Sequence, residues 1–434
     1  MPTAEATIYV IWDNWDVTTP ESYKDDTFIL YGNLTIDGGI LTLDNCNLEM
    51  AYANNVTGYT IHVEENGTFN LLNNSLITTN STSPDPYEFR IDGTALIENS
   101  TVEKMKDIPF YGMDGIVICS HDVKITNSTI RLSESNGIYI ENGTVSITNS
   151  NIIDNNLTGL WISHSSNNNI IGNHFSNNWR GIALGYSSYN NINNNNVSSN
   201  MRGIDLYYSL YNDIINCNVS KNNYHGIYLH GSSNNIITGN NISNNVYGIE
   251  LLSSSNKNNI TNNKVLDHKH GIYILESIGN ILTDNTMMED GIFIAGDQLE
   301  EWNTHNIDTS NTVNGKPVYY WKNQTGGTIP SGAGQVILAN CTNVKIENQS
   351  LTFSDNGIEL GFSSNNNITG NNASSNSGEC GGMYFYYSNG NIIAGNNISS
   401  NNKHGINIGN SYGNCIMDNT VILNTYYGIC IAWY

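Results

Sequence analysis

One short pattern recurs along most of this chain: Gly, then Ile, Leu or Met, then a variable residue, then an apolar residue. Successive glycines of the pattern are mostly 22 or 23 residues apart. They are Gly115, Gly137, Gly159, Gly181, Gly203, Gly226, Gly248, Gly271 and Gly291, then Gly357, Gly382, Gly405 and Gly428. A repeat of this length is typical of stacked supersecondary units, because one unit alone cannot bury its apolar side chains. The pattern predicts one long repeat domain rather than several globular domains.

Apolar and polar residues alternate within each repeat, as Ile249 and Leu251 do around Glu250. No apolar stripe with a 3.6-residue period occurs, and Asn, Ser and Gly divide the chain into short segments. Short segments of period two between turn residues are typical of β-strands. The repeat therefore predicts an all-β fold, a β-solenoid of about 15 coils that stack ~4.8 Å apart.

Asparagine occupies three fixed positions before the repeat glycine, for example Asn168, Asn173 and Asn178 before Gly181. Asparagine tolerates the left-handed bend between strands, and stacked side-chain amides can hydrogen-bond from coil to coil. We expect the same asparagines to do both. Serine forms a further column, at Ser165, Ser187, Ser209, Ser232, Ser254, Ser277, Ser363, Ser388 and Ser411. Cys217 occupies an asparagine position, which predicts that the cysteines are mostly buried structural residues.

The repeat N-x-I-x-x-N-x-I-x-x-N-x-x-G-I-x-I resembles that of the NosD-like and carbohydrate-binding/sugar-hydrolase group. The resemblance covers residues 91–434 and implies a right-handed, single-stranded parallel β-helix. The segment from Trp302 to Trp321 also resembles a segment of NosD-like cell-surface proteins of methanogenic archaea. For function the resemblance implies only a range, because the group includes lyases, hydrolases, copper-pathway accessories and scaffolds.

The chain divides into a short N-terminal part and a long β-helix. Residues 1–35 are irregular and aromatic, which predicts a cap over the first coil. The β-helix spans 36–434, with looser coils over 36–114, regular coils over 115–297, an irregular insertion over 298–345 and regular coils over 346–434. The insertion contains paired glycines and is expected to form a protruding loop or an irregular coil.

Composition excludes some partners. Asp and Glu number 39 against 16 Lys and Arg, and the formal net charge is -23. Such a chain cannot neutralise a phosphate backbone, so nucleic acid is not a predicted partner. No apolar run is long enough to span a membrane, and the first residues lack the features of a signal peptide. Many Asn-x-Ser/Thr sequons favour an exported, cell-surface protein, and the glycosylation candidates are Asn33, Asn66, Asn142, Asn196, Asn241, Asn323 and Asn397.

The variable residue of the repeat is the candidate for function. Its apolar neighbours point inward, so we expect it to face solvent. Aromatic residues are frequent in and beside this column, as on a carbohydrate platform, although tyrosine also simply favours β-strands. The predicted glycan-binding residues are Tyr139, Trp161, Tyr207, Tyr208, Tyr228, Tyr273, Phe293, Arg180 and His225.

An enzyme is the first alternative. Asp205 and Glu250 lie two coils apart in one column, which corresponds to ~9.6 Å by strand spacing. Inverting glycosidases separate their carboxyl groups by ~6.5–9.5 Å. With Arg202 and His270 as cationic or basic partners, these residues would form a polysaccharide lyase or glycoside hydrolase on the external face. No nucleophile signature and no lyase-type Arg motif occurs, so we favour a protein without catalytic activity.

A metal-binding accessory protein, as for copper, is the second alternative. Its candidate ligands are His225, His230, His268 and His270. Neighbouring coils keep matched positions ~4.8 Å or more apart, and no Cys or Met stands beside these histidines. We therefore predict neither a metal site nor a cofactor.

The repeat continues at full strength to Gly428–Ile431 and no capping sequence follows. An uncovered last coil exposes strand edges and core side chains. We expect a further domain or another molecule of the same chain to cover it. Taken together, the sequence predicts an extracellular β-helix that is either a structural surface-layer component or a glycan-binding module.

Overall fold

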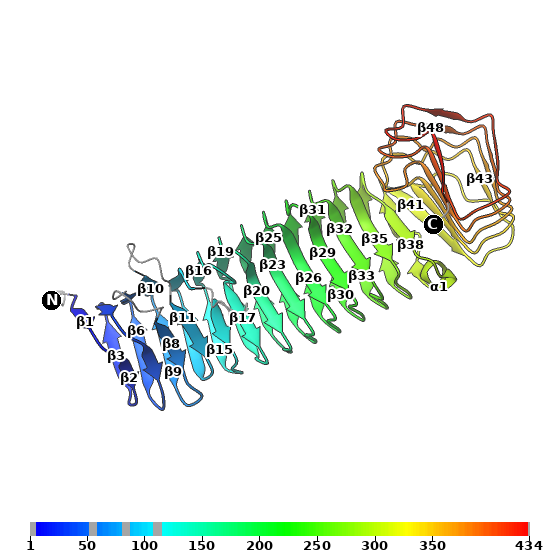
Figure 1. Cartoon of the computed structure of the whole chain (residues 1–434). Coiled ribbons are helices and arrows are strands. Elements are labelled where there is room, and N and C mark those ends of the chain that lie inside the picture. Colours follow the sequence, from blue (N-terminus) through cyan, green and yellow to red (C-terminus); the bar gives the residue numbers. More distant parts are fainter. Residues whose placement is uncertain (1–5, 52–58, 80–86, 107–114, 433–434) are drawn as a thin grey trace. The chain divides into compact units, whose positions relative to one another are not determined.

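The computed structural model describes residues 6–51, 59–79, 87–106 and 115–432. Two compact units make up the chain, Met1–Asn218 (unit 1) and Val219–Tyr434 (unit 2). The fold is an all-β, right-handed parallel β-solenoid of about 18 turns, which confirms the predicted fold class with somewhat more coils than expected. Figure 1 shows the strands stacked coil upon coil within each unit.

Each coil of unit 1 adds one strand to each of three parallel sheets, here called faces 1, 2 and 3. Face 1 contains β1 (Ile8–Ile11), β4 (Thr27–Leu30), β7 (Asn47–Met50), β10 (Leu76–Thr79), β13 (Thr101–Glu103), β16 (Thr129–Arg131), β19 (Asn151–Ile153), β22 (His174–Ser176) and β25 (Asn196–Ser198). Face 2 contains β2 (Trp15–Val17), β5 (Leu34–Ile36), β8 (Thr60–Val63), β11 (Glu88–Ile91), β14 (Ile116–Ile118), β17 (Ile138–Glu141), β20 (Thr158–Ser163), β23 (Arg180–Gly185) and β26 (Arg202–Tyr207). Face 3 contains β3 (Glu21–Lys24), β6 (Ile40–Asp44), β9 (Thr68–Leu72), β12 (Thr94–Glu98), β15 (Val123–Thr126), β18 (Val145–Thr148), β21 (Asn169–Ile171), β24 (Asn191–Asn193) and β27 (Asp213–Ile215), and β28 (Asn218–Ser220) lies at the boundary of the units.

The register of the strands places similar residues above one another. On face 2, Ile138 pairs with Leu160, and Leu160 pairs with Ile182. All three side chains are fully buried. Each such side chain contributes about 1.5–3 kcal/mol when it leaves water, so the inward apolar columns are the main source of stability.

Asparagine ladders connect the coils, as predicted. Asn168 donates its side-chain amide to Asn190 at 2.8 Å, and Asn190 donates to Asn212 at 3.0 Å. The left-handed bend, however, is made by the preceding residue, such as Asn167 with φ +60° or Tyr189 with φ +58°. The expectation that one asparagine both bends the chain and forms the ladder is therefore wrong. Two adjacent residues share these tasks, because the ladder side chain must point into the coil while the bend points outward.

The described part of the segment predicted as an N-terminal cap forms coils of its own. β1 pairs with β4, β2 with β5 and β3 with β6, all in parallel. Its aromatic rings pack on Phe28, with ring centroids at 4.9 Å for Trp15 and 5.0 Å for Tyr9. The aromatic residues of this segment thus pack within the first coils.

Unit 2 begins with coils of the same three-faced kind. Face 2 of this unit contains β29 (His225–His230), β32 (Tyr247–Leu252), β35 (His270–Leu275) and β38 (Ile292–Ala295). Face 3 contains β30 (Ile236–Thr238), β33 (Asn259–Thr261), β36 (Ile281–Thr283) and β39 (Asn306–Ile307), and face 1 contains β31 (Asn241–Ser243), β34 (Lys264–Leu266), β37 (Thr286–Met288) and β40 (Thr312–Val313). Ser255 rather than Ser254 occupies the serine ladder here, because Ser254 forms the left-handed bend with φ +65°.

The segment 298–345 interrupts these coils. It contains α1 (Leu299–Asn303) and β41 (Lys316–Lys322), which pairs antiparallel with β40. Trp302 is fully buried and donates its indole N–H to the Gly296 carbonyl at 2.9 Å, so the segment is anchored on the coils. No helix in the described ranges is long and apolar enough to cross a membrane.

A second stack of coils follows in unit 2. Its first sheet contains β41, β42 (Gln335–Ala339), β44 (Ile358–Gly361), β46 (Met383–Tyr386), β49 (Ile406–Gly409) and β52 (Ile429–Ala432). The other sheets contain β43 (Lys345–Glu347), β45 (Asn367–Thr369), β47 (Ile392–Ala394) and β50 (Cys415–Met417), then β48 (Asn397–Ser399) and β51 (Thr420–Ile422).

Side chains of the second stack accept hydrogen bonds from backbone N–H groups along the edge of β38. Gln335 accepts a hydrogen bond from the Ile292 N–H at 2.9 Å, and Glu359 accepts one from the Ile294 N–H at 3.3 Å. Burial raises the pKa of the Glu359 carboxyl well above its ordinary value. The outward side chains of β42 and β44 thus take the place of a next strand, and the two stacks of unit 2 meet at a corner.

Candidate functional site

Most variable residues of the repeat are buried, which corrects the expectation that they face solvent. Asp205 is 0% exposed, Tyr228 is 9% exposed, and Tyr139, Glu250 and Phe293 are buried as well. These side chains alternate with the inward apolar ones and so point out of the coil. Large neighbours on the same face lie across them, and an outward direction alone does not bring a side chain to the surface.

Face 2 of unit 1 nevertheless contains a hollow of about 320 Å³ over β20, β23 and β26. Ala183 explains it: this small residue pairs with Trp161 on one side and with Asp205 on the other, and so leaves space beside the indole ring. The hollow is lined by Trp161, Ser163, His164, Arg180, Ala183, Leu184, Gly185, Tyr186 and Tyr207. Of the predicted glycan-binding residues, the structure therefore brings Trp161, Arg180 and Tyr207 together.

Two arginines lie over one buried carboxylate beside this hollow. Arg180 Nε donates to Asp205 Oδ2 at 3.0 Å, and Arg202 Nη1 lies 3.5 Å from the same oxygen. The Arg180 guanidinium also lies 5.9 Å from the Trp161 ring and 5.8 Å from the Tyr207 ring. Arg202 donates to the Tyr207 hydroxyl at 2.8 Å. The arrangement holds both guanidinium groups in place, and that of Arg180 lines the hollow.

Aromatic side chains form two ladders at the corners beside face 2. The rings of His164, Tyr186 and Tyr208 stack at centroid distances of 5.3 Å, and those of Tyr189 and Tyr211 stack at 5.2 Å. All five residues adopt left-handed conformations with φ between 45° and 58°, which are uncommon for large side chains. The first ladder includes two residues that line the hollow and forms an apolar wall there.

Sequence reasoning did not include His164, Tyr189 or Tyr211 among the site residues, and it placed Tyr186 only beside the aromatic column. A signal for them exists, since 164, 186 and 208 are 22 residues apart, as are 189 and 211. Aromatic residues recur there at bends that other coils form with asparagine or glycine.

Three of the predicted glycan-binding residues of unit 2, His225, Tyr228 and Phe293, are buried and do not lie on an open surface. His225 and Tyr228 are buried, and their rings stack at 4.6 Å. Phe293 packs against Tyr384 of the second stack at 5.8 Å, and against Tyr273 at 4.8 Å. Tyr139 of unit 1 is likewise buried, and its hydroxyl donates to Glu141.

His270 links the two stacks of unit 2. Its Nδ1 lies 3.1 Å from Asp355 and its Nε2 lies 3.1 Å from Glu379, whose other partners are Lys269 at 3.1 Å and Lys403. Burial lowers the pKa of His270, but the hydrogen bonds to both carboxylates outweigh it and raise this pKa to about 9. The hydrogen bond from His270 is the largest cause that depresses the pKa of Glu379 below its usual range.

The residues of the enzymatic alternative are engaged elsewhere. Asp205 belongs to unit 1 and Glu250 to unit 2, and both are buried. Glu250 lies 2.9 Å from His225 Nε2. Neither carboxylate therefore lies on an open surface of its own unit, and the expected exposed pair is corrected accordingly.

The four histidines considered as metal ligands each have separate partners. His225 pairs with Glu250, His268 Nδ1 lies 2.9 Å from Asp290, His270 contacts Asp355, and His230 lies beside Tyr228. They form no joint site within the described ranges.

A different group, His62, Glu64 and Asp92 in unit 1, has ligand atoms within 4.8 Å of one another. His62 lies 2.8 Å from Asp92 and 3.1 Å from Glu64. Arg90 Nε donates at 2.7 Å to the same Asp92 oxygen that His62 contacts. Burial raises the pKa of Asp92, but the hydrogen bonds from Arg90 and His62 outweigh this and lower it.

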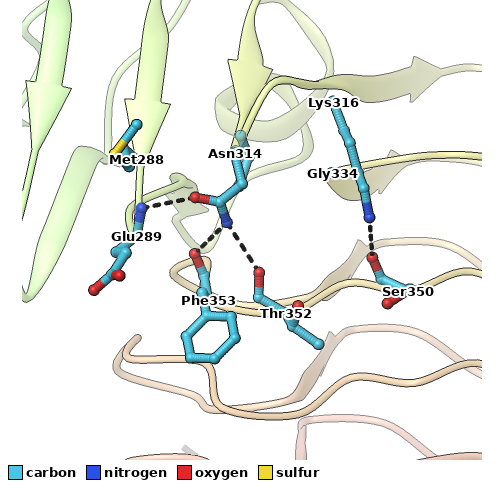
Figure 2. A pocket seen from close by; sticks show the side chains of 9 residues that line it. Met288, Glu289, Asn314, Lys316, Gly334, Ser350, Thr352 and Phe353 are labelled. Atoms are coloured by element: carbon cyan, nitrogen blue, oxygen red, sulfur yellow. Dashed lines mark hydrogen bonds between the residues drawn. The ribbon is translucent and has the colours of Figure 1, made fainter.

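Two further hollows lie in unit 2. The one in Figure 2, of about 160 Å³, is crossed by Asn314, which donates to the carbonyls of Thr352 and Phe353 at 3.1 and 2.9 Å and accepts from the Glu289 N–H at 2.9 Å. Its polar groups thus join the interruption to the second stack. The other, of about 270 Å³, includes Tyr384, Glu276 and Asp297 in its lining.

The glycosylation candidates differ in exposure. Asn66, Asn142, Asn241, Asn323 and Asn397 are exposed, whereas Asn33 and Asn196 are half-buried. Asn196 also hydrogen-bonds to His174 at 2.9 Å. The five exposed asparagines stay predictions for glycan attachment.

Two family models match the sequence. The model described as right handed beta helix region matches residues 114–265 and 211–329. The model described as periplasmic copper-binding protein (NosD) matches residues 32–179 and 317–433, which together are more than half of the chain. No curated protein matches the sequence.

Several solved structures are similar to this chain. The periplasmic alginate epimerase AlgG is 16% identical, with 93% of this chain and 78% of that chain covered and a TM-score of 0.42. A tailspike protein mutant of E. coli bacteriophage HK620, in complex with a pentasaccharide, is 12% identical, with coverages of 78% and 69% and a TM-score of 0.39. PfbA, a surface adhesin of Streptococcus pneumoniae, is 11% identical, with coverages of 94% and 82% and a TM-score of 0.29. Likenesses this distant say nothing about what the present chain binds.

Proposed function

This chain belongs to the family described as periplasmic copper-binding protein (NosD), and we propose that it is a cell-surface β-helix that binds a glycan on face 2 of unit 1. The observation that carries this proposal is the hollow beside Trp161, where an indole, two tyrosines and the guanidinium of Arg180, held by Asp205, converge. Sugar-binding sites need apolar ring surface for the C–H groups of a sugar and fixed polar groups for its hydroxyls. Both kinds of group are present in this hollow.

The competing interpretation is that the aromatic residues only stabilise the coils. A left-handed bend costs a large side chain about 1 kcal/mol or more, and ring stacking returns about 0.5–1.5 kcal/mol. The ladders alone therefore fit a purely structural role. The hollow favours binding, because Ala183 and Gly185 leave a space that a packing role does not need.

We expect Trp161→Ala to weaken glycan binding about tenfold or more, because a central buried aromatic contact dominates most binding sites. The double variant Tyr186→Ala/Tyr208→Ala, which removes the wall of the hollow, is expected to weaken it as well. Affinities would be measured by calorimetry with the oligosaccharides retained in a glycan-array screen, and thermal melting would be followed in parallel.

The matched control is Tyr189→Ala/Tyr211→Ala. This pair has the same spacing, stacking and backbone conformation but does not line the hollow. It is expected to lower thermal stability as much as the Tyr186/Tyr208 variant does and to leave affinity unchanged. Equal losses of affinity in both double variants, or no retained glycan at all, would contradict the proposal.

Copper, which the family description names, does not fit the His62 group, the candidate metal-binding group among the described residues. The His62 group offers one imidazole and two carboxylates, and Arg90 already occupies the Asp92 oxygen that a metal would need. A guanidinium within hydrogen-bonding distance repels a bound cation, and no thiol or thioether donor belongs to the group. The enzymatic alternative at Asp205, Arg202, Glu250 and His270 stays a prediction without a supporting open site.

Self-association through the last coil also stays a prediction. Ile431 is 64% exposed and Ile429 is 44% exposed, whereas the equivalent Ile406 and Ile408 one coil earlier are buried. Ile431→Lys should therefore abolish any increase of particle mass with concentration in light scattering, because a charge opposes burial of that surface. A parent protein of constant mass over the whole concentration series would refute it. A partial cover of the last coil by Trp433 and Tyr434 is a further prediction, and these two residues lie outside the described ranges.

A further inference from the structure

We propose that the sugar residue held in the hollow of unit 1 is anionic, and that Arg180 pairs with its carboxylate or sulfate group. This inference rests on the proposed glycan-binding function and names the class of glycan. It follows from the charge, the geometry and the surroundings of Arg180.

The charge of the hollow is opposite to that of the chain. Acidic residues outnumber Lys and Arg by 39 to 16 over the whole sequence. The nine residues that line the hollow include Arg180 and no Asp or Glu, and the lining residue His164 lies 3.5 Å from the carboxylate of Glu141 beside the hollow. Arg180, in the hollow, and Arg202, beside it, share the carboxylate of Asp205, which is fully buried, while their own side chains are 24% and 27% exposed. These ion pairs set two guanidinium groups against one buried carboxylate.

The Arg180 guanidinium is also held in a fixed position, which favours the binding of an anion. Asp205 holds it through Nε, and the rings of Trp161 and Tyr207 lie on either side at 5.9 and 5.8 Å. A guanidinium fixed in this way loses little freedom when its terminal N–H groups bind the two oxygens of an anion.

A comparison within the molecule supports this assignment. The hollow of about 270 Å³ in unit 2 has tyrosines as well, but Glu276 and Asp297 line it and no Lys, Arg or His does. The acidic composition of the chain therefore extends into that hollow. The positive charge beside Trp161 is a local feature, produced by Arg180 and Arg202 at equivalent positions of consecutive coils.

The test compares charged and neutral forms of the same sugars. Oligogalacturonate and oligoglucuronate would be measured against the same oligosaccharides after reduction of their carboxyl groups, and sulfated against unsulfated dextran oligosaccharides. We expect the intact protein to bind at least one anionic form about tenfold more tightly than its neutral counterpart, since charge-assisted hydrogen bonds are the strong ones. Arg180→Gln should remove this preference, whereas Arg131→Gln, which breaks an ion pair with Glu103 elsewhere in unit 1, should keep it.

The outcomes separate this inference from the function on which it rests. Neutral oligosaccharides that bind as tightly as the anionic ones, with dependence on Trp161, would overturn the anionic assignment and leave glycan binding intact. An anionic preference that survives Arg180→Gln would overturn the role of Arg180. No binding of any oligosaccharide would overturn both. If Arg180→Gln does not fold, the intact protein still tests the anionic assignment. Its preference for anionic over neutral oligosaccharides should be lost when salt is raised from 50 to about 500 mM, because exposed ion pairs are screened by salt.

Discussion

Ile237→Asp is expected to unfold the coils of unit 2 or to lower their stability by about 4 kcal/mol or more. Ile237 lies in an inward column in register with Ile260, and Ile260 is in register with Leu282. All three are fully buried, so a carboxylate at this position has no partner and no access to water. Chemical denaturation followed by circular dichroism measures the loss.

The adjacent residue provides the control for this prediction. Ile236 has the same chemistry, belongs to the same strand β30 and is 39% exposed. Ile236→Asp should change stability by less than about 1 kcal/mol, since the new charge faces solvent. Similar effects of both substitutions would refute the register, because a shift of one residue exchanges the inward and outward sides.

The core of the fold could be predicted because it is local and repeated. The period of 22 or 23 residues, the alternation around residues such as Ile249 and the fixed asparagine positions all act within one coil and its neighbours. The same pattern therefore supports the prediction independently in every coil. Which of two adjacent residues forms the bend could not be predicted, since Asn167 and Asn168 look alike in the sequence. Only Asn167 adopts the left-handed conformation, and Asn168 forms the ladder.

The candidate site could be predicted only in part. That Trp161 and Asp205 point out of the coil followed from alternation, but whether they are exposed depends on which side chains lie across them. Asp205 is covered by Arg180 and Arg202, whereas Trp161 borders a hollow because Ala183 is small. Such coverage depends on the sizes of side chains in neighbouring coils, and the repeat pattern does not specify these sizes.

The contacts in the corner of unit 2 could not be predicted from the sequence, for a different reason. Contacts such as His270 with Asp355 join residues 85 positions apart across the interruption at 298–345. A repeat pattern predicts contacts one coil away and nothing about contacts between two stacks. The packing of Phe293 against Tyr384 belongs to the same corner and could not be read from its position in the repeat.

The corner should make the stability of unit 2 depend on pH. The pKa of His270 is raised from 6.5 to about 9, so its protonated form stabilises the folded state fully below pH 6.5, and this contribution is lost as pH rises through 9. The pKa of Glu379 is depressed, so its contribution is present above pH 4.5 and is lost as pH falls through the depressed value. These two groups together favour the folded corner most between pH 4.5 and 6.5.

We therefore expect the corner to open between pH 6.5 and 9.5, with a loss of about 3 kcal/mol for the shift of His270. Hydrogen exchange of peptides around residues 264–275 and 350–380 measures the opening, because these peptides contain His270, Asp355 and Glu379. The groups that face His270 are Asp355, Glu379, Tyr247 and Tyr273, and Lys269 and Lys403 contact Glu379. His270→Gln keeps a hydrogen-bonding side chain without a titrating group, so its corner should be weaker at pH 6 and should show little further change up to pH 9.5. An equally steep pH dependence of hydrogen exchange in this variant would assign the effect to other titrating groups. Exchange protection that does not change with pH in the parent protein would mean that the His270 ion pairs do not stabilise the contact between the two stacks.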